Sequence, residues 1–334
     1  MMRLFNTGNT SAFGIALTAA AIGLCAALPV SHAQTWPSKP IRLIVPNAPG
    51  GGTDTVARLI AEKVGPALGQ QIIVDNRGGA GGRIAAEFVA RAPKDGYTLL
   101  LGSAATLITG PALDADRKYD PLRDFAPISL AGTTAYMLVT HPSLPARNVR
   151  DLVNLAKARP GRIAYATTGQ GSPAHLGAEL FQAMAGVRMI HVPYKGGAPA
   201  MLSLLQGETF VMISNFLTAL PPVRADRVRA LGVTSLQRSE LAPEIPTIDE
   251  AGLSGFELQQ FYSVVAPAGT PAEVVQRLNQ EIVQRLPAPD VKQRLAHEGI
   301  ELRTSTPGEL GKLNAEQFAK WLKVIQRAGI LRSG

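Results

Sequence analysis

From residue 34 onward, short apolar runs of β-forming residues alternate with longer segments in which apolar residues recur every three or four positions. The longer segments have the spacing of helices that bury one face, as at Val56, Leu59, Ile60 and Val64. The short runs predict strands at residues 41–45, 72–74, 98–101, 136–140, 163–167, 189–192, 210–213, 231–234 and 262–266. Such alternation predicts an α/β fold in which mostly parallel sheets are flanked by helices.

Residues that favour helix starts support this assignment. Thr53 or Asp54 can cap the helix after the first strand, and Ser172 can cap the helix after the fifth strand. Thr270-Pro271 is expected to begin a later helix. The last segment, residues 307–328, predicts a long amphipathic helix that packs back on the first domain.

No linker-like segment divides the chain, although its length suggests two domains. We therefore expect the chain to cross between two lobes more than once, through extended stretches at residues 126–140 and 255–266. These two crossovers would form a hinge. Lobe 1 would contain residues 34–135 and 260–334, and lobe 2 would contain residues 136–259.

The N-terminus has the three parts of a secretory signal peptide. Arg3 is the first charge, an apolar run follows at residues 11–28, and small residues flank a cleavage site at Ser31-His32-Ala33. Cleavage after Ala33 would start the mature chain at Gln34 and place it in the periplasm. The alternative is a retained membrane anchor, but about 18 apolar residues are at the lower limit for a bilayer span.

Cys25 is the only cysteine, and it lies within the predicted signal peptide, residues 1–33. A lipoprotein signal needs a small residue before the lipidated cysteine, whereas Leu24 stands there and the apolar run continues. Without the leader, the chain has no disulfide, no thiol nucleophile and no cysteine ligand for a metal. The mature chain must therefore be stabilised by its own core.

The net charge of +8 falls by one when Arg3 leaves with the leader. The basic residues are scattered, and aromatic residues make up only 5% of the chain. A nucleic-acid surface would need clustered basic residues with aromatic residues among them. We therefore expect no nucleic-acid partner and interpret the charge as a mild field that attracts anions.

The most informative loop joins the first strand to the first helix and contains three consecutive glycines. Glycine lets a backbone approach a ligand closely, and the free N–H groups and positive dipole of a helix start favour an anion. Ligands of open α/β sheets bind at this carboxyl end of the strands. The residues expected to contact a ligand here are Asn47, Ala48, Gly50, Gly51, Gly52, Thr53 and Asp54.

Two further glycine-rich loops lead into helices. The loop at residues 77–82 is as compatible with a contact between lobes or a mobile rim as with ligand binding. The loop at residues 167–175 has a Gly-x-Gly-x-x-Ala spacing, but it lacks the carboxylate that a dinucleotide site needs about twenty residues later. It keeps the character of an anion-friendly helix start, with hydroxyl donors at Thr168 and Ser172.

The sequence contains no arrangement that is typical of catalysis. A Gly-x-Ser-x-Gly elbow and a phosphate loop are both missing. The histidines after residue 34 lack the spacings of zinc hydrolases; they are His141, His175, His191 and His297. The sequence therefore predicts no enzyme activity, no metal site and no cofactor.

A series of short motifs extends over the whole mature chain. These are Trp36-Pro37-Ser38-Lys39-Pro40-Ile41, Val45-Pro46, Ala48-Pro49-Gly50-Gly51, Asp75-Asn76-Arg77, Gly79-Ala80-Gly81-Gly82, Asp95-Gly96-Tyr97-Thr98-Leu99-Leu100, Tyr119-Asp120-Pro121, Asp124-Phe125, His175-Leu176, Val192-Pro193-Tyr194-Lys195-Gly196, Pro246-Thr247 and Ala266-Pro267. In this order and at this spacing, the chain resembles the Bug family, the periplasmic receptors of tripartite tricarboxylate transporters.

The resemblance implies two α/β lobes, similar to type II periplasmic binding proteins, that close over a ligand by a hinge motion. It also implies the capture of organic acids, whose carboxylate is held largely by backbone groups and waters between the lobes. Besides the first glycine loop, the implied contacts are Ser103, Ala104, Thr167, Thr168, Gly169, Gly171, Ser172, Ser214 and Asn215. Tyr194 is a further expected contact. His175, one turn inside the helix after the third loop, is either a packing or capping residue or a ligand contact.

Three positions at the expected pocket depart from the family pattern. Asn47 stands where the family commonly has Phe, Gly110 where it has Asn before a proline, and Ser214 where an aspartate is common. An acid near Ser214 can pair with the ammonium of an amino acid. Its absence argues against α-amino acids and favours dicarboxylates or aromatic carboxylates.

These expectations describe a monomeric receptor that captures a small organic acid and delivers it to a membrane transporter. A sensor that reports ligand occupancy to a membrane kinase would need the same closing motion, and the sequence does not separate the two. An exported enzyme on the same scaffold is less favoured, because the sequence shows no nucleophile or metal cluster.

Overall fold

The computed structural model describes residues 1–2 and 36–331, and the chain divides into the units Met1–Ser38 and Lys39–Gly334. Cys25, the predicted cleavage site after Ala33 and nearly all of the predicted signal peptide lie outside the described residues. The elements below belong to the unit Lys39–Gly334. No helix within the described residues is long and apolar enough to cross a membrane.

Strands and helices alternate along this unit as the sequence pattern predicts. The strands are β1 (Ile41–Val45), β2 (Ile72–Asn76), β3 (Thr98–Ser103), β4 (Phe125–Thr140), β5 (Ala164–Thr167), β6 (Ile190–Pro193), β7 (Val211–Asn215), β8 (Arg229–Val233) and β9 (Gln259–Pro267). The helices are α2 (Gly52–Leu68), α3 (Arg83–Ala90), α4 (Gly110–Leu113), α5 (Val149–Ala158), α6 (Pro173–Ala185), α7 (Gly197–Leu205), α8 (Phe216–Arg224), α9 (Ala272–Arg285), α10 (Pro289–His297) and α11 (Pro307–Ala328). Two shorter helical turns are η1 (Ala80–Gly82) and η2 (Ala105–Thr109).

The strands form one mixed sheet in the order β2-β1-β3-β9-β4-β7-β5-β6, with β8 paired to β4. At one end β1 is parallel to β2 and β3, and at the other β5 is parallel to β6 and β7. Between these groups, β4 and β9 run antiparallel to their neighbours. The predicted α/β architecture is confirmed, although only the outer strands are parallel.

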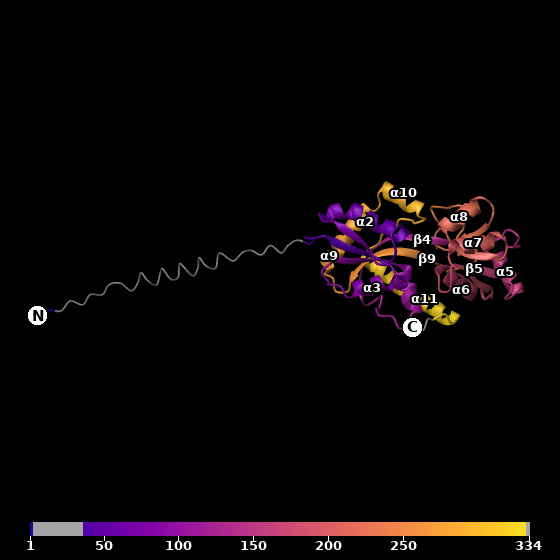
Figure 1. Ribbon diagram of the computed structural model, residues 1–334, viewed down its shortest axis with the longest axis horizontal. Coiled ribbons are helices and arrows are strands. Elements are labelled where there is room, and N and C mark those ends of the chain that lie inside the picture. Colours follow the sequence, from indigo (N-terminus) through magenta and orange to yellow (C-terminus); the bar gives the residue numbers. More distant parts are fainter. Residues whose placement is uncertain (3–35, 332–334) are drawn as a thin grey trace. The chain divides into compact units, whose positions relative to one another are not determined.

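The long strand β4 belongs to both ends of the sheet. Its first part pairs with β9, and its last five residues pair with β7. The register slips next to Gly132. A Cβ at Gly132 would lie 2.7 Å from Ile300 Cγ2, so glycine lets the segment before α11 approach β4. Figure 1 shows β4 and β9 running between the helices α2, α3 and α9 and the helices α5 to α8.

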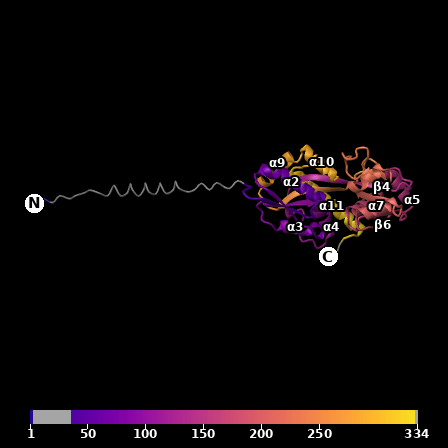
Figure 2. The same cartoon turned by 45° about the horizontal axis from the view of Figure 1, so that its top comes forward.

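Helices cover both faces of the sheet, as the two views show (Figures 1 and 2). At the β5–β7 end, Leu138 of β4 belongs to the core that includes residues of α5 and α6. Its neighbours Met137 and Val139 belong to a second core with residues of α7 and α8. This alternation is the period of a strand that is buried on both faces.

Helix α11 contacts both groups of elements. It begins at a capping box in which Thr306 and Glu309 bond to each other's backbone N–H groups. It packs on β4, η2 and α4, as predicted, but also on α6 at the other end of the sheet. Its buried residues Trp321 and Ile325 share one core with Phe181 of α6, so the hydrophobic core is continuous across β4.

Candidate functional site

The first residues of four helical segments meet at one cavity. These segments are α2, η2, α6 and α8, each of which follows a strand of the sheet. Their first residues, Gly52, Ala105, Pro173 and Phe216, all line a cavity of about 260 Å³. Because α2 and η2 follow β1 and β3 while α6 and α8 follow β5 and β7, this cavity is a cleft between the two ends of the sheet.

The central strands and one connection complete the cleft. Thr134 and Tyr136 of β4 and Gln260 and Tyr262 of β9 line it. The remaining lining residues are Asn215, Leu217, Glu298 and Gly299. The sequence analysis did not select the four strand residues, because it searched the loops that follow strands. Their signal is present, however: each strand carries two polar residues two positions apart, which places them on one face.

Tyr262 and Gly52 lie against each other in this cleft. A Cβ at Gly52 would stand 3.3 Å from the Tyr262 hydroxyl and 3.0 Å from Ile300 Cδ1. Burial raises the pKa of Tyr262, the neighbouring Thr134 hydroxyl partly opposes this, and the charge of Glu298 raises it further. Tyr262 therefore keeps its proton at neutral pH and offers a hydrogen-bond donor to the cleft.

The first glycine loop is shaped by Asp54. Its Oδ2 accepts hydrogen bonds from the Gly50 N–H at 3.0 Å and from Arg58 Nε at 2.8 Å, while Asn76 Nδ2 donates to Oδ1 at 3.1 Å. Burial by itself would raise the pKa of Asp54, but these hydrogen bonds outweigh it and hold the pKa below its usual value. The carboxylate is thus used to fix the loop.

The rest of the loop is open to solvent. Asn47, Ala48, Gly50 and Gly51 are exposed, and nothing lies within 4 Å of a Cβ built at Gly51. Gly51 is the N-cap of α2 and offers no side chain to its first turn. Capping by Thr53 or Asp54 was therefore a wrong prediction: both residues are buried inside the helix.

The second glycine cluster, residues 77–82, packs beneath the first loop. A Cβ at Gly78 would lie 3.5 Å from the Ala48 nitrogen, and one at Gly82 would lie 2.7 Å from Thr106 Oγ1. The residues of this cluster do not line the cleft. The structure thus shows this cluster in contact with the first loop, an arrangement that was not among the alternatives drawn from the sequence.

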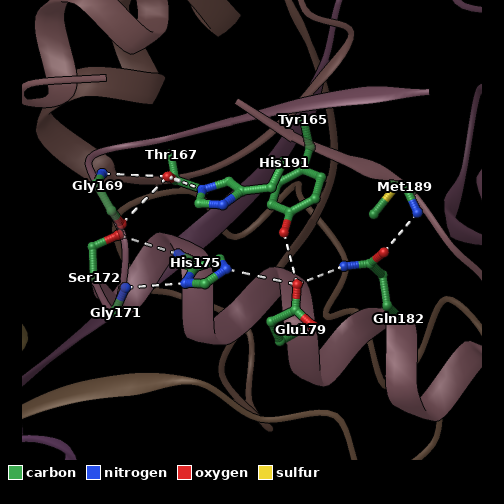
Figure 3. A network of polar contacts seen from close by, with 10 residues as sticks. All are labelled: Tyr165, Thr167, Gly169, Gly171, Ser172, His175, Glu179, Gln182, Met189 and His191. Atoms are coloured by element: carbon green, nitrogen blue, oxygen red, sulfur yellow. Dashed lines mark hydrogen bonds and ion pairs between the residues drawn. The ribbon is translucent and has the colours of Figure 1, made fainter. Parts of the chain in front are cut away.

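The third loop is tied together by its own polar groups (Figure 3). Thr167 is buried, and its hydroxyl accepts the Gly169 N–H at 3.3 Å and lies 2.7 Å from His191 Nε2. Ser172 caps α6 by accepting the His175 N–H at 3.2 Å. Positive φ angles of 129° at Gly169 and 72° at Gly171 explain why glycine occupies both positions. Thr168 is half-buried beside them.

His175 lies under this loop rather than in the cleft lining. Its Nδ1 accepts the Gly171 N–H at 3.0 Å, so the proton of the neutral ring sits on Nε2, which is 3.7 Å from Glu179 Oε1. The ring stacks on His191 with centroids 4.0 Å apart, and His191 also stacks on Tyr165 with centroids 5.1 Å apart (Figure 3).

Burial keeps both histidines neutral. It lowers the pKa of His175, and it lowers the pKa of His191 to about 4, with a further contribution from the neighbouring His175. Glu179 also accepts hydrogen bonds from the Tyr165 hydroxyl at 2.7 Å and from Gln182 at 3.0 Å. We therefore interpret the pair as a support for the third loop. Across residues 36–331, no three His, Cys, Asp or Glu residues are grouped so as to hold a metal ion.

Three other predicted contacts, Ser103, Ala104 and Tyr194, do not line the cleft. The Ser103 hydroxyl accepts the Thr106 N–H at 3.3 Å, and Ala104 directly precedes the lining residue Ala105. Tyr194 donates its N–H to the Thr167 carbonyl at 3.0 Å and does not line the cleft.

At the end of β7, Ser214 and Asn215 differ in exposure. Ser214 is buried, and its hydroxyl has no hydrogen-bond partner within the described part of the chain. Asn215 is exposed and caps α8 by accepting the Thr218 N–H at 2.9 Å. Of the residues predicted to bind a ligand, Gly52 and Asn215 line the cleft, and the others are not among its lining residues.

Comparison with known proteins gives a consistent family assignment. Residues 56–330 match the model of the tripartite tricarboxylate transporter family receptor, TctC. The chain is 41% identical over 293 residues to a UPF0065 protein from the tcbD-tcbE intergenic region of Pseudomonas sp. strain P51. The aligned region covers 87% of each protein. It is 38% identical over 304 residues to protein BugT of Bordetella pertussis, covering 91% of this chain and 93% of BugT.

Solved structures of similar fold include proteins with and without a ligand. A protein of R. palustris with adipate has a TM-score of 0.70 at 36% identity, covering 88% of this chain and 98% of that chain. MatC from Rhodopseudomonas palustris with bound malate has a TM-score of 0.67 at 32% identity, covering 87% and 100%. A TctC solute-binding protein from Polaromonas without ligand has a TM-score of 0.81 at 27% identity, covering 88% and 100%.

The family model covers most of the chain, and these relatives cover it at 38–41% identity. The chain therefore belongs to the Bug/TctC family of tripartite tricarboxylate transporter receptors, which are periplasmic solute-binding proteins.

Proposed function

We propose that this protein captures a small organic carboxylate in the cleft and delivers it to a tripartite tricarboxylate-type membrane transporter. The observation that carries the proposal is the meeting of four helical segments at one cavity, each through its first residue. A longer helix presents free N–H groups and a positive dipole at its start, and both favour an anion. A cleft between two ends of a sheet is also suited to closing over a ligand.

The size and lining of the cleft support a small acid as ligand. A volume of about 260 Å³ lies below the range of about 300–1,000 Å³ that is typical of sites for drug-sized molecules. Hydroxyl and amide groups of Tyr262, Tyr136 and Gln260 line it and can fix the orientation of a ligand. Two related proteins were solved with adipate and malate, which are small dicarboxylates.

We further propose that the cleft closes by a hinge at β4 and β9, between lobe 1 (residues 34–135 and 260–334) and lobe 2 (residues 136–259). The similarity to the unliganded Polaromonas protein supports an open arrangement here. Its TM-score of 0.81 exceeds the 0.70 and 0.67 of the ligand-bound proteins, although its identity of 27% is lower. In a two-lobed protein, a less identical relative can have the higher TM-score when its lobes have the same relative position, because a different lobe position lowers the score even if each lobe keeps its fold.

The remaining parts of the proposal follow from the family and the site. The receptor acts in the periplasm after cleavage behind Ala33, as a monomer, and releases its ligand unchanged. The ligand contacts come from the first and third glycine loops and from Ser103, Ala104, Ser214 and Asn215. The titratable histidines near the site are used to hold a loop, which supports binding rather than catalysis.

The test uses the chain that begins at Gln34, purified and screened by thermal shift against mono-, di- and tricarboxylates and their uncharged amides. A true ligand should raise the midpoint in proportion to its concentration. Calorimetry should then give one site per chain, and the acid should be recovered unchanged after long incubation. Stabilisation by the amides as strong as by the acids, or slow conversion of the acid, would contradict the proposal.

A further inference from the structure

The charge inside the cleft has the opposite sign from what an anion receptor would be expected to carry. Among the residues that line it, Glu298 is the only one with an ordinarily charged side chain. No lysine or arginine of the described chain lines the cleft. A ligand carboxylate would therefore meet helix starts and neutral donors, together with one fixed negative charge.

The backbone around Glu298 is held from several sides. Gly299 lies against α8, where its Cβ would be 3.4 Å from Phe216 Cβ and 3.5 Å from Leu217 Cγ. Ile300 faces Gly52 at the start of α2. Glu301 exchanges two backbone hydrogen bonds of 2.8 Å with Thr133 of β4. The connection between α10 and α11 thus presents Glu298 at a fixed place between the two ends of the sheet.

The carboxylate of Glu298 is not used to hold this segment. It makes no hydrogen bond or ion pair with any described residue, and the side chain is half-buried. Acids close by are engaged differently: Asp54 accepts hydrogen bonds from Arg58 and Gly50, and Glu301 lies 3.5 Å from Arg303. A carboxylate that is held at a binding cleft without an internal partner is available to a ligand.

We propose that Glu298 is a specificity-determining residue that receives the positively charged nitrogen of a zwitterionic organic acid. The acid's own carboxylate lies at the starts of α2, α6 and α8. This inference rests on the proposed carboxylate receptor and names its ligand class. A like charge beside Glu298 is unfavourable, whereas an ammonium within about 4 Å is attracted, more strongly in a closed cleft than in water.

The inference changes the expectation that was based on Ser214. That expectation looked for an acid only at the end of β7, where none stands. Glu298 supplies an acid from a segment more than eighty positions further along the chain, and it lines the same cleft as Asn215 and Phe216. The charge partner for an ammonium is therefore present in the cleft, although not at the position where the family pattern places it.

The test compares pairs of ligands that share one carboxylate and one methylene chain and differ in the charged group at the other end. β-Alanine, 4-aminobutyrate and 5-aminopentanoate are paired with succinate, glutarate and adipate, in which a carboxylate replaces the ammonium. Binding is measured by calorimetry for the wild type, Glu298→Gln and Glu298→Lys. Glu208→Gln is the matched control, because Glu208 is exposed in the turn before β7 and does not line the cleft.

In the wild type, the amino acid of each pair should bind more tightly than the dicarboxylate. Glu298→Gln should weaken the best amino acid by about tenfold or more, which corresponds to about 1.4 kcal/mol. Glu298→Lys should reverse the order within each pair, and Glu208→Gln should leave it unchanged. If an acid outside the six probes binds best, the same variants are titrated with that acid.

Unchanged or tighter binding of the best acid by Glu298→Gln would overturn the role of Glu298, while the carboxylate receptor would stand. Failure of the wild type to bind any organic acid would instead refute the proposed function itself. The two failures are therefore distinguishable in one set of titrations.

Discussion

Gly51 and Gly52 are neighbours in the sequence but differ in their surroundings. A Cβ at Gly52 would lie 3.0 Å from Ile300 Cδ1 and 3.3 Å from the Tyr262 hydroxyl, which is too close for van der Waals contact. Gly51, in contrast, has nothing within 4 Å of a Cβ and a φ of −99°. Gly52 is therefore required for packing between α2 and β9. Gly51 has no such packing constraint, so we infer that its lack of a side chain lets a ligand approach the loop.

Gly51→Val tests this distinction. We expect the variant to fold, because its Cβ meets nothing within 4 Å and its φ is accessible to all residues. Binding of the best organic acid should weaken by about tenfold or more, since the branched side chain blocks approach to the first turn of α2. The measurements are the thermal midpoint without ligand and the dissociation constant by calorimetry.

Gly308→Val is a suitable control for this substitution. Gly308 lies in the first turn of α11, and a Cβ there also meets nothing within 4 Å. It does not line the cleft. Equal affinities of the two variants for the acid would remove the first glycine loop from the ligand site.

At the scale of elements, the stacked histidines join β5, β6 and α6 beneath the third loop. His191 belongs to β6 and bonds to Thr167 of β5, while His175 belongs to α6 and bonds to Gly171 in the loop. Protonation of either ring would place a charge in a stack of one buried ring, His175, and one half-buried ring, His191 (Figure 3). Loop geometry and folding stability are therefore linked to pH through this pair.

The sign of the linkage follows from the lowered pKa of His191, about 4 in the fold against 6.5 for the free side chain. Between these values the unfolded chain binds more protons, so folding stability is full above pH 6.5 and decreases as the pH falls toward 4. His191→Asn should reduce the loss of stability between pH 7 and pH 5, by about 1 kcal/mol after allowance for solvent exposure. Denaturant unfolding at both pH values measures this difference.

His297→Asn provides the comparison for that experiment. His297 is exposed on α10, outside the stack, so its replacement should leave the pH dependence of stability as in the wild type. An identical loss of stability between pH 7 and pH 5 in the wild type and in His191→Asn would exclude the stack as its origin.

Elements could be predicted from the sequence where local pattern determines them. Apolar runs located every strand, and the periodicity over residues 307–328 gave the bounds of α11. The antiparallel pairing of β4 with β9 could not be read in the same way, because strand order depends on contacts between distant segments. The same limit applies to Glu298 and Tyr262, which reach the cleft only through that pairing and through the approach of Ile300 to Gly132.

The ligand contacts of hydroxyl groups at the site could not be predicted from the sequence either. Ser172 was expected to be a hydroxyl donor at a helix start, and Ser103 and Thr167 were contacts implied by the family resemblance. In the structure their side chains bond to Thr106, Gly169 and His175. Sequence places such residues near a site, but only the fold shows whether a backbone group already uses them.

At the scale of the unit Lys39–Gly334, the segments that reach both ends of the sheet include β4, β9 and α11. β4 and β9 connect them through the sheet, and α11 connects them through its contacts with η2, α4 and α6. The cleft is lined by β4 and β9 but not by α11. Closing the cleft would therefore bend the two strands while α6 shifts against the last turns of α11.

The proposed closure can be measured because residues 34–334 contain no cysteine. Two spin labels at Ala48→Cys and Lys195→Cys report on exposed loops after β1 and β6, at opposite ends of the sheet. A saturating acid should shift their distance distribution to shorter values. A second pair, Ala48→Cys and Gln71→Cys, lies within one end of the sheet and should keep its distances. If both pairs behave alike with bound acid, the cleft does not close by a hinge at β4 and β9, and capture must occur in the arrangement described here.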